Sequence, residues 1–360
     1  MKTILGGSKK KGSSRTKASS SSSKDAKAKA LIGKTIEVKN RRFKVKEILG
    51  EGGYSNVYRV VEEGSNNVFA LKRMLVSVDE MDLVKREVSL MKSIPPHRNL
   101  VHFECANVTT SAEQRKGEDL MEANIIMEYA DVRLFDVMEA RHTEGKYFTE
   151  AELIAIMVDV CEGVAVLHQH RPPIAHRDIK VENVLLGNDG AYKLCDFGSA
   201  TSVTHHPKTA AERDAAEADI ERNTTMVYRA PEMLDLYAAK PIDEKADIWA
   251  LGCMLYKMCF FEDAFSIGGR LAILQANFSF PLAPKYSPEL NECIKYMLEL
   301  NAEERPSITA VIRRLQRLKA GLGQDTPGKH RRSRTWGGSQ DNLHIDDIPP
   351  AAANVRIFLA

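Results

Sequence analysis

The sequence lacks the features that mark several classes of protein. No apolar run among its 360 residues is long enough to span a bilayer, and the first residues show neither a signal-peptide core nor the Met-Gly start required for myristoylation. The six cysteines form no C-x-x-C pair and no Cys/His cluster at zinc spacing, which predicts reduced thiols and no structural zinc. We therefore expect a cytoplasmic protein without a transmembrane segment, with peripheral membrane attachment or the nucleus as alternative locations.

The charge is nearly balanced overall but uneven along the chain. Lys and Arg total 51 against 49 Asp and Glu, and 43% hydrophobic residues can bury one large core or two lobes. Residues 6–30 hold little besides Gly, Ser, Lys and Ala, so residues 1–36 are predicted to be a disordered basic arm. The arm either contacts anionic lipid or is a solvated linker. The absence of aromatic residues argues against nucleic acid as its partner.

Two patterns divide the rest of the chain into lobes. Period-2 alternation predicts strands at 43–49, 56–61, 68–74 and 124–129, with a helix at 83–94, which makes a β-rich N-lobe over about 37–130. A capping box at Thr149 and Glu152 begins a run of helices, with others at 248–259, 287–298 and 308–318. These form a larger helical C-lobe over about 131–320, followed by an irregular tail at 321–360. The fold class is α+β and bilobal.

A glycine-rich turn lies between the first two of these strands, in the run from Leu49 to Tyr58. Gly50, Gly52 and Gly53 would let backbone N–H groups approach phosphate oxygens, and Val57 would cover an adenine. The usual third glycine is Ser55 here, so a plain glycine-rich hairpin remains an alternative for this turn taken alone.

The next strand, Val68-Phe69-Ala70-Leu71-Lys72, sends one ammonium group out from apolar neighbours. A buried lysine is costly without a partner. Glu87 on the following helix is our candidate for the ion pair that orients Lys72 on phosphates, with Glu80 and Asp82 as competitors.

The strongest signal is the run from His176 to Asn183. It places a base (Asp178), an ammonium group for the γ-phosphate (Lys180) and a metal ligand (Asn183) on one loop. Thirteen residues after Asn183, the Asp196-Phe197-Gly198 motif supplies a second metal ligand. Mg²⁺ prefers few protein oxygens plus phosphate, so ATP with Mg²⁺, or Mn²⁺ instead, is the expected cofactor.

Supporting residues follow along the chain. Thr225 is expected to hydrogen-bond Asp178 and Lys180, which makes it part of the catalytic set. Glu232 of the Ala-Pro-Glu motif would be buried and need a cation, for which Arg305 is the candidate. Asp247 is expected to brace the backbone of the catalytic loop.

With these motifs in place, residues from about 43 to 318 resemble a complete protein-kinase domain, and Lys180 resembles the Ser/Thr class. Finer similarity to the Numb-associated kinase family, which includes adaptor-associated, cyclin-G-associated and yeast actin-regulating kinases, lies in Gly53-Tyr54-Ser55, Val181-Glu182-Asn183, Leu194–Thr201, Thr224–Tyr237 and Lys245–Lys257.

This resemblance implies an additional helix after the Ala-Pro-Glu motif, from Met233 to Tyr237 and onward. It implies threonine substrates among endocytic-adaptor or actin-patch proteins and activity without activation-loop phosphorylation. The same alignment makes Met127 the residue that gates the back pocket and gives Glu128 and Ala130 backbone hydrogen bonds to adenine. The nucleotide set is then Leu49, Gly50, Gly52, Gly53, Val57, Ala70, Lys72, Glu87, Met127, Glu128, Ala130, Leu185 and Cys195.

Other classes of function are weighed against this one. In a pseudokinase scaffold the fold survives as a binding surface, but Lys72, Asp178, Asn183 and Asp196 are all intact. A small-molecule kinase is disfavoured by the peptide-groove segment from Thr225 to Glu232. Cys195 is a candidate reactive thiol, although packing explains it more simply.

Overall fold

The computed structural model describes residues 28–52, 55–115, 118–322 and 357–359. Contacts divide them into two units. The first holds the described residues up to 76, together with 105–126 and 357–359, and the second holds 77–104 and 127–322. Residues 77–104 were expected in the N-lobe over about 37–130, but these contacts group them with the second unit. They include the helix predicted at 83–94. Each unit is described separately below.

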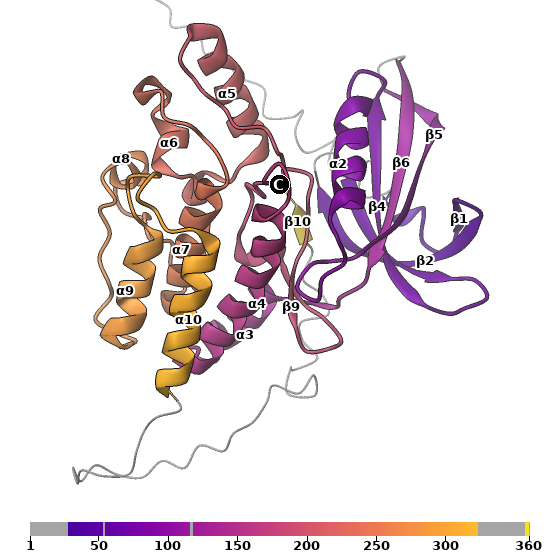
Figure 1. Ribbon diagram of the computed structural model, residues 1–360. Helices are drawn as coiled ribbons and strands as arrows, with labels where there is room; N and C mark the ends of the chain where they lie inside the picture. Colours follow the sequence, from indigo (N-terminus) through magenta and orange to yellow (C-terminus); the bar gives the residue numbers. More distant parts are fainter. Residues whose placement is uncertain (1–27, 53–54, 116–117, 323–356, 360) are drawn as a thin grey trace, which may run out of the picture. The chain divides into compact units, whose positions relative to one another are not determined.

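The first unit is mainly one sheet, whose strands β1 to β6 are drawn from indigo to purple in Figure 1 and whose strand β10 is drawn in yellow. The strand order is β1-β2-β3-β4-β6-β5, and β10 pairs with β2 in parallel. The strands are β1 (Thr35–Val38), β2 (Arg41–Gly52), β3 (Ser55–Glu62), β4 (Val68–Ser77), β5 (Phe103–Arg115), β6 (Glu118–Glu128) and β10 (Ile357–Leu359). The four predicted strands are confirmed, but β5 was missed because its alternation is weak.

The core of this unit follows from two-residue alternation. Phe43 and Val45 are fully buried on β2, and their neighbours on β3 and β4 complete the same face. The rings of Phe43 and Phe69 meet edge to face at 5.8 Å between centroids. The buried cluster is Val38, Phe43, Val45, Tyr58, Val60, Phe69, Leu71, Cys105 and Ile126.

The expected disorder of the arm does not extend to residues 28–36. Ala28 is buried, and its carbonyl accepts a hydrogen bond from the Tyr58 hydroxyl at 3.4 Å. Gly33 donates its N–H to the carbonyl of Val45 at 2.9 Å, just before β1 begins. Residues 1–27 of the predicted arm lie outside the described residues.

The second unit is mainly helical. A small sheet with the order β7-β8-β9 accompanies its helices. The strands are β7 (Val132–Arg133), β8 (Val184–Leu186) and β9 (Tyr192–Leu194). The helices are α2 (Met81–Ser93), α3 (Leu134–Thr143), α4 (Glu150–His168), η1 (Val181–Asn183), α5 (Ala210–Asn223), η2 (Met226–Tyr228), α6 (Pro231–Leu234), η3 (Leu236–Ala238), α7 (Lys245–Phe260), α8 (Gly269–Leu274), α9 (Pro288–Met297) and α10 (Ile308–Leu322).

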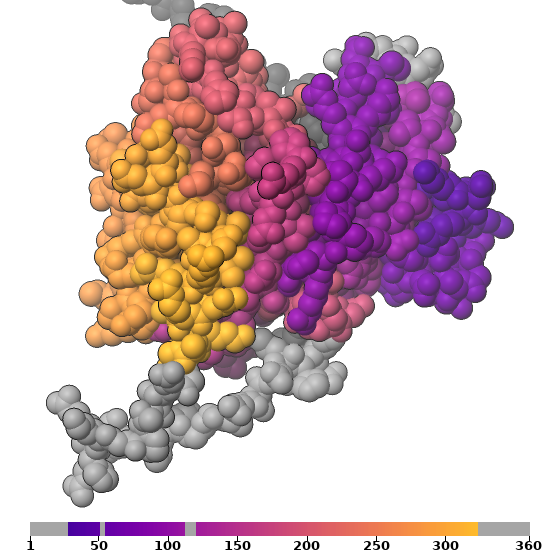
Figure 2. All heavy atoms as spheres, viewed as in Figure 1, coloured from indigo at the N-terminus to yellow at the C-terminus, as the bar shows by residue number. Residues whose placement is uncertain are grey.

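Helix α7 lies at the centre of this unit. Its residues are buried almost without exception, as its all-round apolar sequence predicts, and it contacts both α4 and α9. Trp249 is fully buried and stacks on Phe265 with 5.4 Å between ring centroids. Helices α9 and α10 pack together and, in orange and yellow, occupy much of the face of this unit shown in Figure 2.

The segment from Met233 to Tyr237 does not form the helix expected there. Between the Ala-Pro-Glu motif and α7 the described chain forms only the short α6 and η3, and Ala239, which follows η3, has the left-handed conformation. A longer helix, α5, lies before the motif. The Thr209 side chain accepts a hydrogen bond from the Glu212 N–H and begins α5, which buries Ala216 and Ile220. The expectation for Met233 to Tyr237 is therefore wrong, because Asp235 caps the shorter η3 instead.

Two smaller differences concern the tail and membranes. The region expected to be irregular from residue 321 still belongs to α10 through Leu322, and β10 is a strand; residues 323–356 lie outside the described part of the chain. Within the described residues, no helix has the length and apolar character needed to cross a bilayer.

Candidate active site

The catalytic loop follows α4 in the second unit and is fixed from α7. Asp247 is fully buried and accepts hydrogen bonds from the N–H groups of His176 at 2.7 Å and Arg177 at 2.8 Å. His168 contacts the same carboxylate at 2.9 Å. Burial opposes ionisation of Asp247, but the bonds and charges of His168 and His176 outweigh it and lower its pKa. The expected brace for the loop is confirmed.

The predicted catalytic residues meet at one carboxylate. The Thr225 hydroxyl donates to Asp178 Oδ1 at 2.7 Å. Lys180 Nζ donates to the Thr225 oxygen at 3.0 Å and lies 2.9 Å from Asp178 Oδ2. Asn183 Nδ2 donates to the same Oδ2 at 2.9 Å and to the Asp178 carbonyl at 2.8 Å. Asp178 is thus held in one orientation, with its side chain 14% exposed.

The proposed metal ligands fit a hard divalent cation. Because Asn183 uses its amide nitrogen on Asp178, its Oδ1 is turned the other way, and this buried oxygen has no hydrogen-bond partner. Such an orphaned acceptor suits a cation. Asp196 has a positive φ of 62°, and its Oδ1 accepts from the Gly198 N–H at 3.3 Å. Mg²⁺ binds few protein oxygens and keeps waters or substrate phosphates as its other ligands, so one Asn and one Asp would suffice on the protein side.

The candidate adenine residues of this unit lie around β6 and β8. Met127, Glu128, Ala130 and Leu185 are all half-buried. The Glu128 N–H already donates to the His102 carbonyl at 2.8 Å, so that particular group is not the one that would meet adenine.

Two side-chain contacts near these residues bear on the sequence analysis. The Glu128 carboxylate pairs with the buried Lys193 at 3.1 Å, a contact that the sequence did not indicate. Cys195 donates its Sγ–H to the Asn183 carbonyl at 3.3 Å, which favours packing over a reactive role for this thiol.

The remaining candidates belong to the first unit. Val57 on β3 lies directly opposite Lys72 on β4, and Ala70 is two residues from Lys72, so the three side chains share one face of the sheet. Leu49, Gly50 and Gly52 lie on β2, whereas Gly53 lies outside the described residues. Glu87 lies on α2 in the second unit, and its pairing with Lys72 stays a prediction.

The predicted partner of Glu232 is confirmed. Arg305 donates from Nη1 to Glu232 Oε1 at 2.7 Å and from Nη2 to Oε2 at 2.9 Å. Both side chains are buried, which explains the bidentate geometry. This pair connects α6 to the segment between α9 and α10.

Arg177, the residue before Asp178, makes a contact that the sequence analysis missed. Its guanidinium pairs with Asp219 on α5. The only sequence signal was the alternation of acids with alanines along α5, which does not say which acid faces inward.

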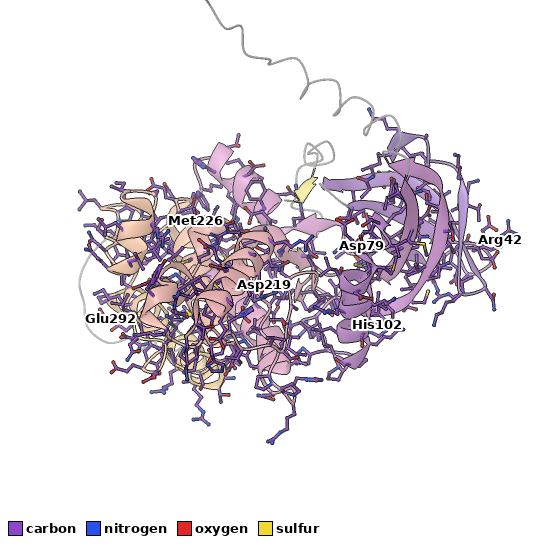
Figure 3. The ribbon with its side chains drawn as sticks, turned by 90° about the horizontal axis from the view of Figure 1, so that it is seen from above. Arg42, Asp79, His102, Asp219, Met226 and Glu292 are labelled. Carbon is purple, nitrogen blue, oxygen red and sulfur yellow. The ribbon has the colours of Figure 1, made fainter. Side chains whose placement is uncertain are left out.

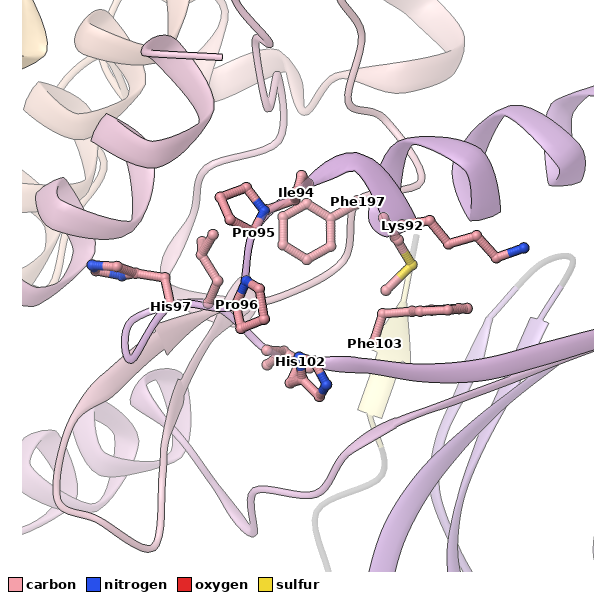
Figure 4. Close-up of a pocket in the computed structure, with 11 residues that line it drawn as sticks. Lys92, Ile94, Pro95, Pro96, His97, His102, Phe103 and Phe197 are labelled. Atoms are coloured by element: carbon pink, nitrogen blue, oxygen red, sulfur yellow. The ribbon is translucent and has the colours of Figure 1, made fainter. Parts of the chain in front are cut away.

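Phe197 of the Asp-Phe-Gly motif lines a small pocket with the end of α2 (Figure 4). The pocket has a volume of about 180 Å³, and Pro95, Pro96 and Phe103 are among its lining residues. The buried ring of Phe197 also meets His176 edge to face, with 5.6 Å between centroids. The Phe197 ring therefore contacts the catalytic loop and borders a pocket that the end of α2 also lines.

An α+β fold with a fixed carboxylate, a neighbouring ammonium group and two oxygen ligands defines the fold and site class of the protein kinases. Residues 43–315 match the protein kinase domain family, and the chain belongs to that family. It is 41% identical over 291 residues to a probable serine/threonine-protein kinase of Dictyostelium discoideum, covering 80% of this chain and 35% of that protein.

Two further relatives match a similar share of this chain. A second probable serine/threonine-protein kinase of Dictyostelium discoideum is 40% identical over 290 residues, which cover 80% of this chain and 25% of that protein. Actin-regulating kinase 1 of Saccharomyces cerevisiae is 35% identical over 291 residues, which cover 79% of this chain and 45% of that protein. The chain thus spans less than half of the length of each of these relatives.

Proposed function

We propose that the chain is an ATP-dependent serine/threonine protein kinase that transfers the γ-phosphoryl group to protein hydroxyl groups. The observation that carries this proposal is the Asp178 carboxylate held by Thr225, Lys180 and Asn183. The names of the relatives and the match to the protein kinase family support it.

Each residue has one chemical task in this proposal. Asp178 accepts the proton of the substrate hydroxyl, and Lys180 stabilises negative charge on the transferred group. Thr225 hydrogen-bonds both Asp178 and Lys180 and fixes their relative positions. Asn183 and Asp196 would hold Mg²⁺, or Mn²⁺ in its place, and the bound metal would neutralise charge on the phosphates.

Phosphate transfer from labelled ATP to a generic protein substrate tests the proposal. Asp178→Asn should lower kcat by about 10²–10⁴-fold, because it removes the base. The control is Asp214→Asn on the exposed face of α5, which should keep full activity. Equal transfer by wild type and Asp178→Asn would contradict the role of Asp178 as the base, and transfer by neither protein would support the pseudokinase scaffold.

We further propose membership of the Numb-associated kinase family, with threonine targets in endocytic-adaptor or actin-patch proteins. The supporting observations are the motif resemblance and the yeast relative named as an actin-regulating kinase. A peptide-library profile with a clear threonine preference is the expected result. A profile that accepts serine and threonine equally would contradict the threonine assignment.

The same resemblance leads us to propose that activity does not require phosphorylation of the activation segment, which runs from Gly198 to Ala230. Protein treated with phosphatase, and shown by mass spectrometry to carry no phosphate, should keep its kcat. Loss of activity on this treatment would contradict the proposal.

For the basic arm we propose contact with anionic lipid at a cytoplasmic membrane surface. Binding to phosphatidylserine vesicles should weaken as salt is raised and disappear on deletion of residues 1–27. Unchanged vesicle binding after the deletion would rule this role out.

A further inference from the structure

The backbone of Arg177 is held by a hydrogen bond, and its side chain is buried. Its φ of 68° lies in the left-handed region, where the N–H is aimed at Asp247 Oδ1, 2.8 Å away. The side chain is 8% exposed, and its Nε donates to the Ser199 carbonyl at 2.6 Å. A guanidinium this deeply buried requires an anion, and Asp219 supplies it.

Asp219 accepts hydrogen bonds from three side chains. Its Oδ2 accepts from Arg177 and lies 2.7 Å from His205 Nε2, and its Oδ1 accepts from Asn223 at 2.7 Å. Burial disfavours the charged form, but the bonds from His205 and Arg177 prevail and hold the pKa of Asp219 well below its ordinary value. The carboxylate is therefore ionised throughout the physiological pH range.

The other acids of α5 do not share this environment. Asp214, Glu217 and Glu221 are exposed to solvent, whereas Asp219 is half-buried beside Ile220. Figure 3 labels Asp219 among the side chains of the second unit. Asp219 is thus distinguished from its helical neighbours by burial and bonding.

Backbone hydrogen bonds anchor the segment between Gly198 and α5 to two other parts of this unit. Ala175 and Thr201 exchange backbone hydrogen bonds of 2.8 and 2.9 Å. His205 exchanges bonds of 3.1 and 3.0 Å with Ile242, which precedes α7. Between these backbone anchors, the pair of Arg177 with Asp219 is the ionic link.

We propose that Asp219 is a positioning residue for phosphoryl transfer, acting through Arg177 on the loop that carries Asp178. Activation segments of kinases are commonly ordered when an added phosphate pairs with arginine. Here a carboxylate of α5 already provides the anion, so the segment holds its own counter-charge. This inference rests on the proposed kinase activity and assigns that activity a support outside the catalytic motifs.

The test compares three variants of the full chain, each free of phosphate by mass spectrometry. Asp219→Asn keeps the shape but removes the charge, and should lower kcat about tenfold while KM for ATP stays within about twofold. Asp219→Glu keeps a carboxylate and should recover part of the loss. Glu217→Gln makes the same charge change on the exposed side of α5 and should match wild type.

A second measurement separates positioning from simple instability. Hydrogen exchange of residues 176–183 and 198–205 should rise in Asp219→Asn at a temperature where its near-UV circular dichroism matches wild type, and should not rise in Glu217→Gln. Wild-type kcat in Asp219→Asn would overturn the inference. The inference would also be overturned if Asp219→Asn and Asp219→Glu lost equal kcat and each loss followed the decrease in Tm of that variant. A wild type that transfers no phosphate would instead refute the proposed function.

Discussion

At the scale of single residues, this site depends on carboxylates whose partners are fixed before any substrate binds. Asp178 and Asp247 each receive several donors, and the two are linked through the backbone of the loop between them. Asp247 is fully buried, yet its hydrogen-bond donors lower its pKa. Contacts within the protein therefore fix the orientation of Asp178, the proposed base.

The Asp247→Asn variant tests this support. The amide turns one acceptor into a donor facing the loop N–H groups, so the free energy of unfolding at pH 7 should fall by about 2–3 kcal/mol. Urea unfolding measures it, and Glu262→Gln, an exposed change just past α7, is the control. A loss below about 0.5 kcal/mol would contradict the brace.

The pH dependence of the same variant follows from the lowered pKa of Asp247. A depressed folded pKa means that the stabilisation is complete above the unfolded value near 3.9 and is lost as pH falls through the folded pKa. The difference between wild type and Asp247→Asn should therefore be equal at pH 7 and pH 5 and shrink below about pH 4. A difference that already shrinks between pH 7 and pH 5 would point to another group.

At the scale of elements, two contacts decide how helices pack in the second unit. Gly163 on α4 lies so close to the segment before β5 that an added Cβ would meet the Asn99 carbonyl oxygen at 2.6 Å. The buried pair of Glu232 and Arg305 connects α6 to the segment between α9 and α10. A larger residue at position 163 would require the backbone to move, and loss of either member of the ion pair would leave the other charge buried without a partner.

The Gly163→Ala variant should be destabilised by about 1–3 kcal/mol through overpacking, although alanine favours helix. Gly321→Ala on α10 is the matched control, since its Cβ would meet nothing within 4 Å. It should gain between zero and about 1 kcal/mol. Chemical unfolding of both variants checks the contrast, and similar signs for the two changes would refute the close approach at Asn99.

The Glu232→Ala variant should lose about 3–5 kcal/mol, because it leaves the buried Arg305 without its counter-charge. Glu292→Ala removes a pair with Lys295 in which both side chains are more than half exposed, and should cost far less stability than the Glu232 change. Thermal unfolding of the two variants side by side measures the difference. Comparable losses would show that burial does not govern the Glu232 pair.

At the scale of the whole molecule, the residues predicted to bind nucleotide are divided between the two units. Lys72 and the strands beside it belong to the first unit, and the catalytic loop and Asp196 belong to the second. A nucleotide bound by the folded chain should raise its stability.

A non-hydrolysable ATP analogue with Mg²⁺ should stabilise the folded protein by about 2.7 kcal/mol when present at 100 times its Kd. The shift should vanish without divalent metal and should be greatly reduced in Asn183→Ala, which removes the orphaned oxygen. Differential scanning calorimetry measures both. A full shift in metal-free buffer would exclude the proposed metal ligands.

Much of the fold was predictable from local pattern. Strands β2, β3 and β4 and helices α4, α7, α9 and α10 follow from alternation, helical stripes and the Thr149 capping box. The residues proposed for catalysis could also be predicted from the sequence, because their types and their spacing within one loop match the roles that phosphoryl transfer requires. The missed elements, β5 and α3, have weak patterns that only their packing partners resolve.

The sequence by itself determined which loop carries Asp178, Lys180 and Asn183, and the proposed chemistry rests on that loop. Only the tertiary structure decided that residues 210–223 form α5, that Asp219 is the acid of that helix which meets Arg177, and that Asn183 points its oxygen away from Asp178. The physical reason is that motif roles depend on residues near in sequence. Burial and charge pairing at Asp219 depend on Arg177, 42 positions away in the chain.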